Sequence, residues 1–369
     1  MVCRVPPAAL LAAAYLAALG AGPARADVVV GLPLPRSGQA TAIGEQVFRG
    51  ASAAARAINA AGGIRGEPIV LDVRDDACDP KQAVAVAEDY VRRGVRLVVG
   101  HVCSGTSIVA SDVYAEAGAV MVSPASTAAR LTDRNLAGIL RVCWRDDDQG
   151  RLSAAIIAER FKDRKIAILH DSTPVSRGLA DATKTNLNKI GIVETLFLGT
   201  APGERDYGPL LARLKGAGIE LAYYGGDAPE MGLLVRQADE QGFKPQWFGT
   251  SGIATPTFAK VAGGAADGTL MTYPPDPRRR PEAAEALAAL KAEGSDGAGF
   301  TLYAYAAVQA LAKAAAAAGA ADPRAVERTL KSERFDLVLG QVGFDQKGDI
   351  TAPGYVLYVW KNGSYTYPD

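Results

Sequence analysis

Three hydroxyl residues follow apolar, strand-like runs in the first half of the chain, where helix-like segments begin. Ser104 follows the run 95–100, and Ser126 and Thr127 follow the run 120–123. The N-terminus of a helix presents unpaired N–H groups and a partial positive charge, and both suit an anion. The pattern therefore predicts a carboxylate-binding site. Hydroxyl residues that only cap helices give the same pattern, so that alternative stays open at this point.

Two cysteines lie beside the same residues. Cys78 lies in the turn 75–80, and Cys103 directly precedes Ser104. Their placement in two neighbouring turns suggests a disulfide beside a ligand-binding turn. Cys143 lies in an apolar run and is expected to stay a buried free thiol. The chain has only 2 histidines and no Cys-x-x-Cys pair, which argues against a metal site.

The first 26 residues have the pattern of a secretory signal peptide: Arg4, an apolar run over 8–19, and small residues up to Ala26. The run is shorter than the roughly 20 residues that span a membrane, and a short N-terminal anchor is the alternative. We expect cleavage after Ala26. Removing Arg4 and Arg25 from the 40 basic residues leaves 38 against 40 acidic ones. Such a balance gives no electrostatic footprint for nucleic acid, and export favours the disulfide.

Strand-like and helix-like segments must position these residues, and they alternate along the chain. Continuous apolar runs predict buried parallel strands, at 28–32, 69–73, 95–100, 120–123, 165–170, 221–224 and 247–249. Segments with helical spacing lie between them, at 46–61, 79–93, 107–117, 178–189 and 231–240. In the second of these helices, Asp79, Pro80 and Gln82 form a capping-box pattern. The order predicts parallel sheets covered by helices on both faces.

The last third of the chain departs from this alternation. The proline- and arginine-rich segment 273–281 is expected to cross between two α/β units. An alanine-rich helix follows at 303–318, and a strand at 355–360 leads into an Asn362-Gly363 hairpin turn. Two α/β units would create a cleft between them, and ligands of such sheets bind outside the carboxyl ends of the strands.

The ordered set of motifs resembles the periplasmic leucine/isoleucine/valine-binding proteins of ABC importers. The matching stretches span essentially the whole mature chain, at 75–87, 99–104, 148–150, 223–226, 229–232 and 347–349. The resemblance implies an α/β fold with two Rossmann-like lobes that contain parallel sheets and are joined by three crossovers. It places one lobe at 27–145 plus 275–352 and the other at 146–274 plus 353–369. It also implies a Cys78–Cys103 disulfide.

The same resemblance implies a function. The expected protein is a monomer in the periplasm that captures a small branched-chain or aliphatic amino acid between its lobes and delivers it to an ABC permease. It would use no cofactor and catalyse no reaction. The alternative is a binding protein or sensor domain for another small carboxylate. A hydrolase or dinucleotide enzyme is disfavoured, because neither a G-x-S-x-G elbow nor a G-x-G-x-x-G fingerprint is present.

The resemblance assigns roles to particular residues. It places the ligand carboxylate on Ser104 and Thr127, beside backbone groups of Ala125 and Ser126. In the family an acidic residue that binds the ligand ammonium stands where this chain has Ser251. Because a buried ammonium needs a counter-charge, we expect Asp227, at a usually aromatic position, to replace it.

Three further positions are expected to shape the side-chain pocket. Ile43 and Val175 stand where the family tends to have tyrosine, which predicts a more aliphatic pocket. Arg177, expected in the same loop as Val175, could reach a second carboxylate, although a surface arginine is the commoner outcome. The predicted specificity is therefore not a copy of leucine binding.

Overall fold

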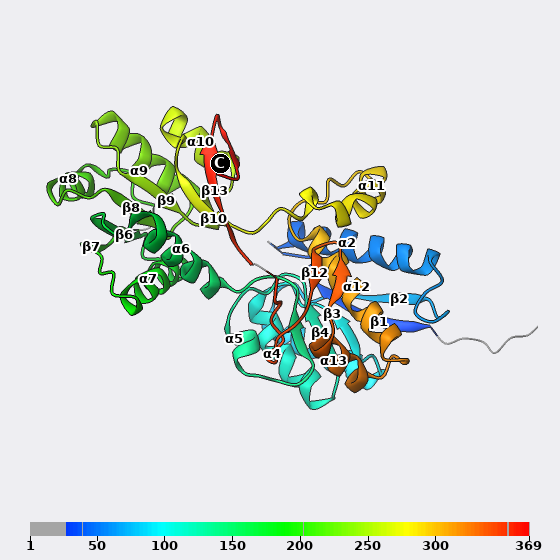
Figure 1. Cartoon of the computed structure of the whole chain (residues 1–369). Helices are drawn as coiled ribbons and strands as arrows, with labels where there is room; N and C mark the ends of the chain where they lie inside the picture. Colours follow the sequence, from blue (N-terminus) through cyan, green and yellow to red (C-terminus); the bar gives the residue numbers. More distant parts are fainter. Residues whose placement is uncertain (1–26, 39, 202, 353, 369) are drawn as a thin grey trace, which may run out of the picture.

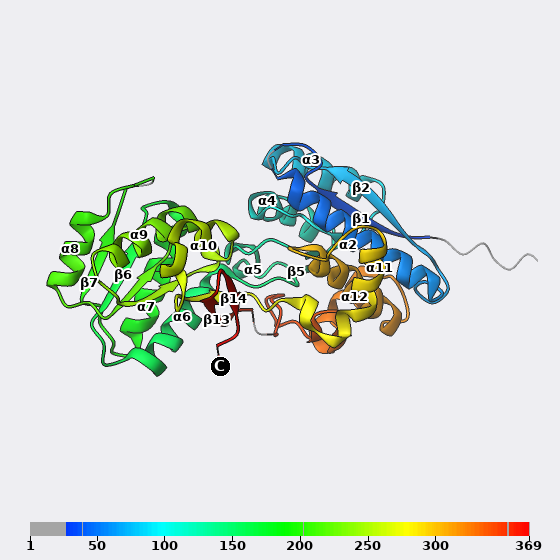
Figure 2. The same cartoon turned by 90° about the horizontal axis from the view of Figure 1, so that it is seen from above.

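The computed structural model describes residues 27–38, 40–201, 203–352 and 354–368. The predicted signal peptide lies outside these described residues. Figures 1 and 2 show two α/β bodies, the first and second lobe, that are linked by extended segments. Among the described residues, none of the helices combines the length and the apolar character that a membrane crossing requires.

The first lobe is built on a five-stranded sheet in the order β2-β1-β3-β4-β5. Every neighbouring pair in it is parallel. Its strands are β1 (Val28–Leu34), β2 (Ile69–Asp75), β3 (Leu97–Val99), β4 (Val120–Ser123) and β5 (Ile139–Arg141). Most of their residues are buried apolar side chains, as the continuous apolar runs predict for strands covered on both faces.

Helices cover both faces of this sheet. One face packs on α2 (Thr41–Ala60), α12 (Thr301–Ala317) and α13 (Pro323–Ser332), and the other on α3 (Pro80–Arg92) and α4 (Ser104–Glu116). Helices α2 and α12 approach closely because Gly50 has no side chain, and a Cβ there would lie 1.8 Å from the carbonyl oxygen of Thr301. The smaller elements are α5 (Arg130–Asp133), α11 (Ala284–Ala292), β11 (Phe335–Leu337) and β12 (Gly340–Val342).

The second lobe contains a seven-stranded sheet in the order β14-β13-β10-β9-β8-β6-β7. Its parallel strands are β6 (Ile166–His170), β7 (Leu196–Gly199), β8 (Leu221–Tyr224), β9 (Gln246–Gly249) and β10 (Leu270–Tyr273). The predicted Asn362-Gly363 hairpin joins two antiparallel strands, β13 (Val356–Lys361) and β14 (Ser364–Thr366). The second sheet is therefore mixed, because the C-terminal hairpin extends its parallel part.

Two layers of helices enclose this second sheet. The first layer is α6 (Asp146–Phe161) and α7 (Pro174–Lys189), which share one apolar core with β6 and β8. The opposite layer is α8 (Gly208–Gly216), α9 (Ala228–Glu240) and α10 (Pro256–Ala262). Both faces of the central strands are thus removed from water, which stabilises the lobe by burying apolar surface.

The chain passes between the two sheets three times, as the predicted crossovers require. The first passage follows β5, the second follows β10, and the third precedes β13. The second contains the 3-10 turns Pro277–Arg279 and Pro281–Ala283. The predicted lobe boundaries at 145, 274 and 352 fall in or next to these passages, and they stay predictions.

Several predicted helix starts were wrong. Helix α4 begins at Ser104, which confirms the prediction that this serine opens a helix but not the start at 107, and α7 begins at Pro174 rather than at 178. The second difference has a local cause, because the Thr173 hydroxyl accepts a hydrogen bond from the Ser176 N–H and proline suits the first helical position. Val175 and Arg177 therefore lie in the first turn of a helix and not in a loop.

The expectation that Ser126 and Thr127 open a helix was also wrong. The next helix, α5, begins only at Arg130 and has four residues. The Ser123 hydroxyl accepts from the Ser126 N–H at 3.0 Å and sets a turn there. The Arg141 guanidinium also binds the carbonyl groups of Ser126 and Ala128, which helix formation would need.

One half of the predicted capping box forms at the start of α3. Asp79 accepts a hydrogen bond from the Gln82 N–H at 2.9 Å, as predicted. The Gln82 side chain does not return this bond, because it donates to the Asp75 carbonyl at 2.7 Å. The Asp79 N–H is instead satisfied by the carbonyl group of Asp76.

Candidate functional site

A disulfide joins the two turns that carry the predicted carboxylate site. Cys78 and Cys103 are bonded, as predicted, with their Cα atoms 5.6 Å apart. Cys103 is the N-cap residue of α4, so the bond fixes the start of this helix to the turn after β2. Cys143 is buried and free, as expected. Burial raises the pKa of its thiol to about 12, and the thiol donates to the Ser126 carbonyl.

A buried polar cluster lies next to the two turns that contain Cys78 and Cys103 and holds them in place. The His101 ring lies between Asp76 and Tyr114, with Nδ1 2.6 Å from the Asp76 carboxylate and Nε2 3.1 Å from the Tyr114 hydroxyl. All three side chains are buried. The second carboxylate oxygen of Asp76 accepts from the Cys78 N–H. The cluster therefore ties β2, β3 and α4 together beneath the disulfide.

The hydroxyl group of Ser126 belongs to this support rather than to an open surface. Ser126 is fully buried, and its Oγ lies 2.5 Å from the Ser107 Oγ. The hydroxyls of Ser107, Ser123 and Ser126 all donate to the His101 carbonyl. The Ser126 side chain therefore holds the loop, and its half-buried neighbour Thr127 is the hydroxyl residue that stays partly accessible near the predicted site.

Ser104 joins the two halves of the predicted carboxylate site. Its Oγ accepts a hydrogen bond from the Ala128 N–H at 3.2 Å, which links the first residue of α4 to the loop 124–129. The first-turn N–H groups of α4 have no partner within the helix and face the same end. Thr127 is half-buried and Ala125 is buried in this loop.

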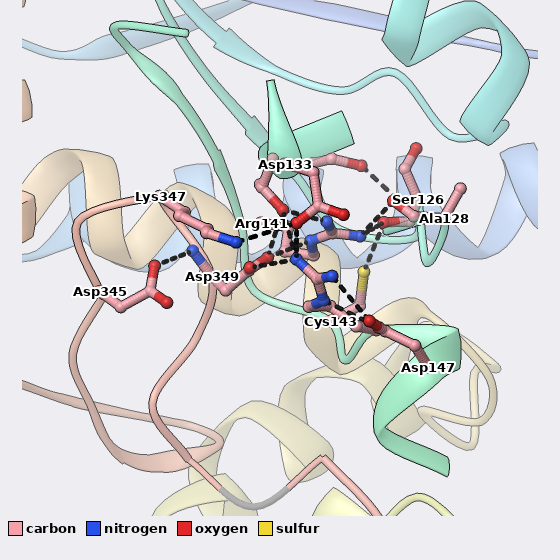
Figure 3. A network of polar contacts seen from close by, with 12 residues as sticks. Ser126, Ala128, Asp133, Arg141, Cys143, Asp147, Asp345, Lys347 and Asp349 are labelled. Atoms are coloured by element: carbon pink, nitrogen blue, oxygen red, sulfur yellow. Dashed lines mark hydrogen bonds and ion pairs between the residues drawn. The ribbon is translucent and has the colours of Figure 1, made fainter. Parts of the chain in front are cut away.

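The loop is held from behind by Arg141, at the end of β5 (Figure 3). The Arg141 side chain is fully buried and donates to the carbonyl groups of Ser126 and Ala128 at 2.8 and 2.9 Å. Its Nε donates to the Asp349 carboxylate at 2.7 Å. Thr132 donates its hydroxyl to the same carboxylate at 2.8 Å. The predicted carboxylate loop therefore rests on a buried ion pair.

This ion pair continues into the first passage between the lobes. Arg145 donates to the second oxygen of Asp349 at 2.9 Å, and it also binds Asp133 and Asp147. Lys347 closes the set with a 3.1 Å contact to Asp133 (Figure 3). Because the Arg145 guanidinium is bound to them, the pKa values of Asp133 and Asp147 are lowered. Asp147 lies in α6, so the network reaches the second lobe.

Asp227 and Ser251 lie next to each other on the second lobe. Asp227 is the exposed N-cap residue of α9, and Ser251 begins a 3-10 turn after β9. A Cβ on Gly252 would lie 2.4 Å from a carboxylate oxygen of Asp227, so the side chain lies against this turn. The pKa of Asp227 is raised by partial burial and by the carboxylates of Asp171 and Glu230.

The three residues predicted to shape the side-chain pocket are exposed. The exposed fractions are 36% for Ile43 and 73% for Val175. The Arg177 side chain is 62% exposed and lies 3.5 Å from the carboxylate of Asp181, one turn further along α7. The structure thus shows a surface ion pair for Arg177. Their roles toward a ligand stay predictions.

A cavity of about 310 Å³ lies between the lobes, on the side of the three passages. We call it the hinge cavity. Thr127 of the first lobe and Ser251 of the second lobe both line it. The remaining lining residues are Trp144, Asp146, Tyr273, Pro274, Pro275, Asp276, Pro277, Arg278, Gly297, Gly299, Phe300, Tyr303, Tyr355 and Tyr365. Ser104, Ala125, Ser126, Asp227, Ile43, Val175 and Arg177 do not line it.

Sequence reasoning missed most residues of the hinge cavity. Trp144 and Tyr355 lie in passages between the lobes, and Pro274 to Arg278 form the second passage. The proline-rich composition of 273–281 was the one signal that pointed to this place. Burial raises the pKa of Asp146. Burial also acts to raise the pKa of Asp276, but hydrogen bonds from the side chain and backbone of Arg278, with the charges of Arg278 and Arg279, outweigh it and lower the pKa.

The sequence neighbours His170 and Asp171 are residue types that a hydrolase could use, but their side chains do not pair in the described part of the chain. His170 is buried at the end of β6, and its Nδ1 accepts a hydrogen bond from the Ser172 N–H at 3.0 Å. Asp171 binds Thr173 instead of His170. Burial lowers the pKa of His170. Within the described residues, no group of three His, Cys, Asp or Glu side chains is arranged to hold a metal ion.

Comparison with known proteins decides the family. The family model described as "Periplasmic binding protein" matches residues 27–364. The chain belongs to the periplasmic binding protein family. Among the curated relatives of this periplasmic binding protein, Leu/Ile/Val-binding protein homolog 1 of Brucella suis is 45% identical over 344 residues, which cover 93% of each chain. The amino acid binding protein of Pseudomonas aeruginosa is 44% identical, over 93% of this chain and 92% of its own.

Solved structures confirm the two-lobed fold of this periplasmic binding protein. An ABC transporter substrate-binding protein from Desulfitobacterium hafniense in complex with Leu aligns with a TM-score of 0.76 at 23% identity, covering 93% of this chain and all of that one. A leucine-binding protein from Thermotoga maritima aligns with a TM-score of 0.71 at 24% identity, over 93% and 98% of the two chains. The family model and the curated relatives are named for binding and not for catalysis, which confirms the expectation of a binding protein rather than an enzyme.

Proposed function

We propose that this chain is the solute receptor of an ABC importer for small α-amino acids, which it binds between its lobes. The name of its Brucella suis relative, at 45% identity, points to the branched-chain class. The observation that carries the proposal is the hinge cavity, which has Thr127 of one lobe and Ser251 of the other on its walls. A ligand held by both lobes stabilises their closed arrangement through hinge motion.

The family places the protein in the periplasm. Cleavage of a signal peptide after Ala26, the monomeric state and the absence of nucleic acid among its partners remain our proposals. Delivery follows from the ABC family: a permease of the inner membrane would receive the amino acid from the closed form.

The carboxylate end of the ligand is proposed to bind the first lobe. Ser104 and Thr127 would donate their hydroxyl groups, next to the backbone of Ala125 and Ser126. Two observations support this assignment: the hydrogen bond from the Ala128 N–H to Ser104 joins the two segments, and α4 directs its N-terminus to the same end. The partial positive charge of a helix N-terminus favours a carboxylate.

The amine end is proposed to bind the second lobe through Asp227, with Ser251 as a neutral neighbour. Asp227 is supported by its position against the Ser251–Gly252 turn and by its raised pKa, which an ammonium ion nearby would relieve. Glu230 and Asp171 add negative potential at the same place. Ile43, Val175 and Arg177 would contact the ligand side chain only after the lobes close.

Isothermal titration calorimetry on the mature protein tests the proposal. The ligands are leucine, isoleucine, valine, alanine and plain carboxylic acids of the same size. Thr127→Val removes one hydroxyl at constant shape, and we expect about 10- to 100-fold weaker binding, as for a hydrogen bond to a charged group. Asp227→Asn should weaken amino acids but not plain acids. Thr329→Val, on the remote helix α13, is the matched control.

One result would contradict the proposed ligand class, and another would contradict only the role of Asp227. Binding of plain carboxylic acids without any α-amino acid would move the function to the alternative class of small carboxylates. Amino-acid affinity that is unchanged in Asp227→Asn would remove Asp227 from the site while leaving the receptor function in place.

A further inference from the structure

The hinge cavity is lined mainly by aromatic rings and prolines. Six of its 16 lining residues are aromatic and three are proline. Aromatic residues make up only 7% of the whole chain. Among the described residues, no leucine, isoleucine, valine or methionine lines the cavity. Flat rings on the walls favour a flat ring in the cavity, because aromatic pairs gain from stacked and edge-to-face contacts.

Trp144 is the centre of the aromatic wall. Its ring makes edge contacts with Tyr303 and Tyr355, with centroids 4.9 and 5.7 Å apart, and it stacks on Phe300 at 6.1 Å. Tyr303 and Tyr355 are buried, whereas Trp144 is only half-buried. The neighbours therefore fix the orientation of the indole, and part of its surface stays open to the cavity.

A second aromatic wall comes from the other lobe. Tyr273 at the end of β10 and Tyr365 in β14 contact each other edge to face, with centroids 5.7 Å apart. Both residues are half-buried and both line the cavity. The cavity is thus bounded by rings from both lobes, so closure of the lobes would bring rings to both sides of a bound group.

Most of the charge in the cavity is compensated within the protein. Asp276 and Arg278 bind each other through three pairs of atoms at 2.9 to 3.2 Å, and their charges compensate. Asp146 is the other carboxylate, and its N–H donates to the Thr127 carbonyl at 2.9 Å. Thr127 and Ser251 place the predicted head-group positions on the same walls. A volume of about 310 Å³ is at the small end of ligand pockets.

We propose that the hinge cavity is an aromatic subsite that takes the ring of an amino-acid side chain, with Trp144 as its specificity-determining residue. The ligand range of this protein then extends from the branched-chain amino acids to phenylalanine and amino acids of similar shape. This inference rests on the proposed function, because it uses the head-group positions on Thr127 and near Ser251.

Calorimetric titration with phenylalanine and leucine tests the subsite. We expect wild-type protein to bind phenylalanine with an affinity within about tenfold of that for leucine. Trp144→Leu should weaken phenylalanine at least about tenfold and leucine by less than about threefold. Tyr365→Leu, which removes a ring from the opposite wall, should shift the preference in the same direction. Phe197→Leu, in β7 and outside the cavity, is the control and should shift neither affinity.

The outcomes separate this inference from the proposed function. Wild-type affinity for phenylalanine more than about tenfold below that for leucine would overturn the aromatic subsite and leave the receptor function intact. Equal weakening of both ligands in folded Trp144→Leu and Tyr365→Leu would overturn it too. A protein that binds no amino acid at all would instead overturn the proposed function. Circular dichroism of each variant shows whether it is folded.

Discussion

Removing Asp349 should destabilise the first lobe strongly, because it leaves a buried arginine without its counter-charge. The Asp349 carboxylate accepts hydrogen bonds from Thr132, Arg141 and Arg145 at 2.7 to 2.9 Å. The Arg141 side chain is 0% exposed and that of Asp349 is 10% exposed. Breaking such a pair by removing one partner costs about 3–5 kcal/mol in the free energy of unfolding.

Urea unfolding followed by far-ultraviolet circular dichroism measures this effect in Asp349→Ala. For a lobe of this size, the same loss lowers Tm by roughly 6 °C or more. Asp349→Asn keeps the size and one acceptor, so its cost should be smaller. The expected order of stability is therefore wild type, then Asp349→Asn, then Asp349→Ala.

Asp147→Ala is the matched control for this prediction. Asp147 also pairs with Arg145, but its side chain is 51% exposed. Exposed ion pairs contribute about 0–1 kcal/mol, so Asp147→Ala should change the free energy of unfolding little. If Asp349→Ala costs no more than Asp147→Ala, the buried pair is not what holds this part of the lobe.

Substitution of Asp349 should also weaken ligand binding. Arg141 holds the carbonyl groups of Ser126 and Ala128, and without Asp349 its guanidinium loses its fixed position. We expect Asp349→Asn to weaken amino-acid binding by about tenfold in calorimetry at a temperature where the variant stays folded. Unchanged affinity would show that the loop keeps its shape without this anchor.

Three further predictions concern cysteines and a carboxylate. Replacing both Cys78 and Cys103 by serine should lower the free energy of unfolding by about 3 kcal/mol, since the bond closes a loop across a sequence separation of 25; equal denaturant midpoints would contradict this. Cys143 should react with a thiol reagent only in denaturant, because it is buried and its pKa is raised to about 12; fast labelling of folded protein would refute its burial. The pKa of Asp227 is raised in the folded chain by burial and by neighbouring carboxylates, so its ionisation opposes folding above that pKa and has no effect below the ordinary pKa. Asp227→Asn should therefore raise the Tm of the unliganded protein at neutral pH but not near about pH 3, and equal shifts at both pH values would contradict this.

The sequence predicted those features that depend on local patterns. The apolar runs located β1 to β4 and β6, and Asp79 with Pro80 located the start of α3. The pairing of Cys78 with Cys103 followed from two turns after strands that are consecutive in the chain, together with the family resemblance. In each case a few consecutive residues contain the necessary information.

Features that depend on residues far apart in the chain could not be predicted from the sequence. Ser126 looked like a helix cap, but Arg141 takes the carbonyl groups that a helix would use, and Asp349, more than 200 residues away in the chain, fixes Arg141. The hinge cavity combines residues from both lobes and all three passages. No periodicity or motif relates such positions, because only the folded chain brings them together.

The half-buried position of Trp144 provides the protein with a built-in optical reporter. The chain contains 3 tryptophans, and the other two, Trp247 and Trp360, are buried in the core of the second lobe. Trp144 alone among them lines the hinge cavity. Indole emission moves to shorter wavelength when water leaves the ring, so occupancy of the cavity should be visible as a blue shift without any attached dye. Transport substrates could then be screened in unlabelled protein by fluorescence alone.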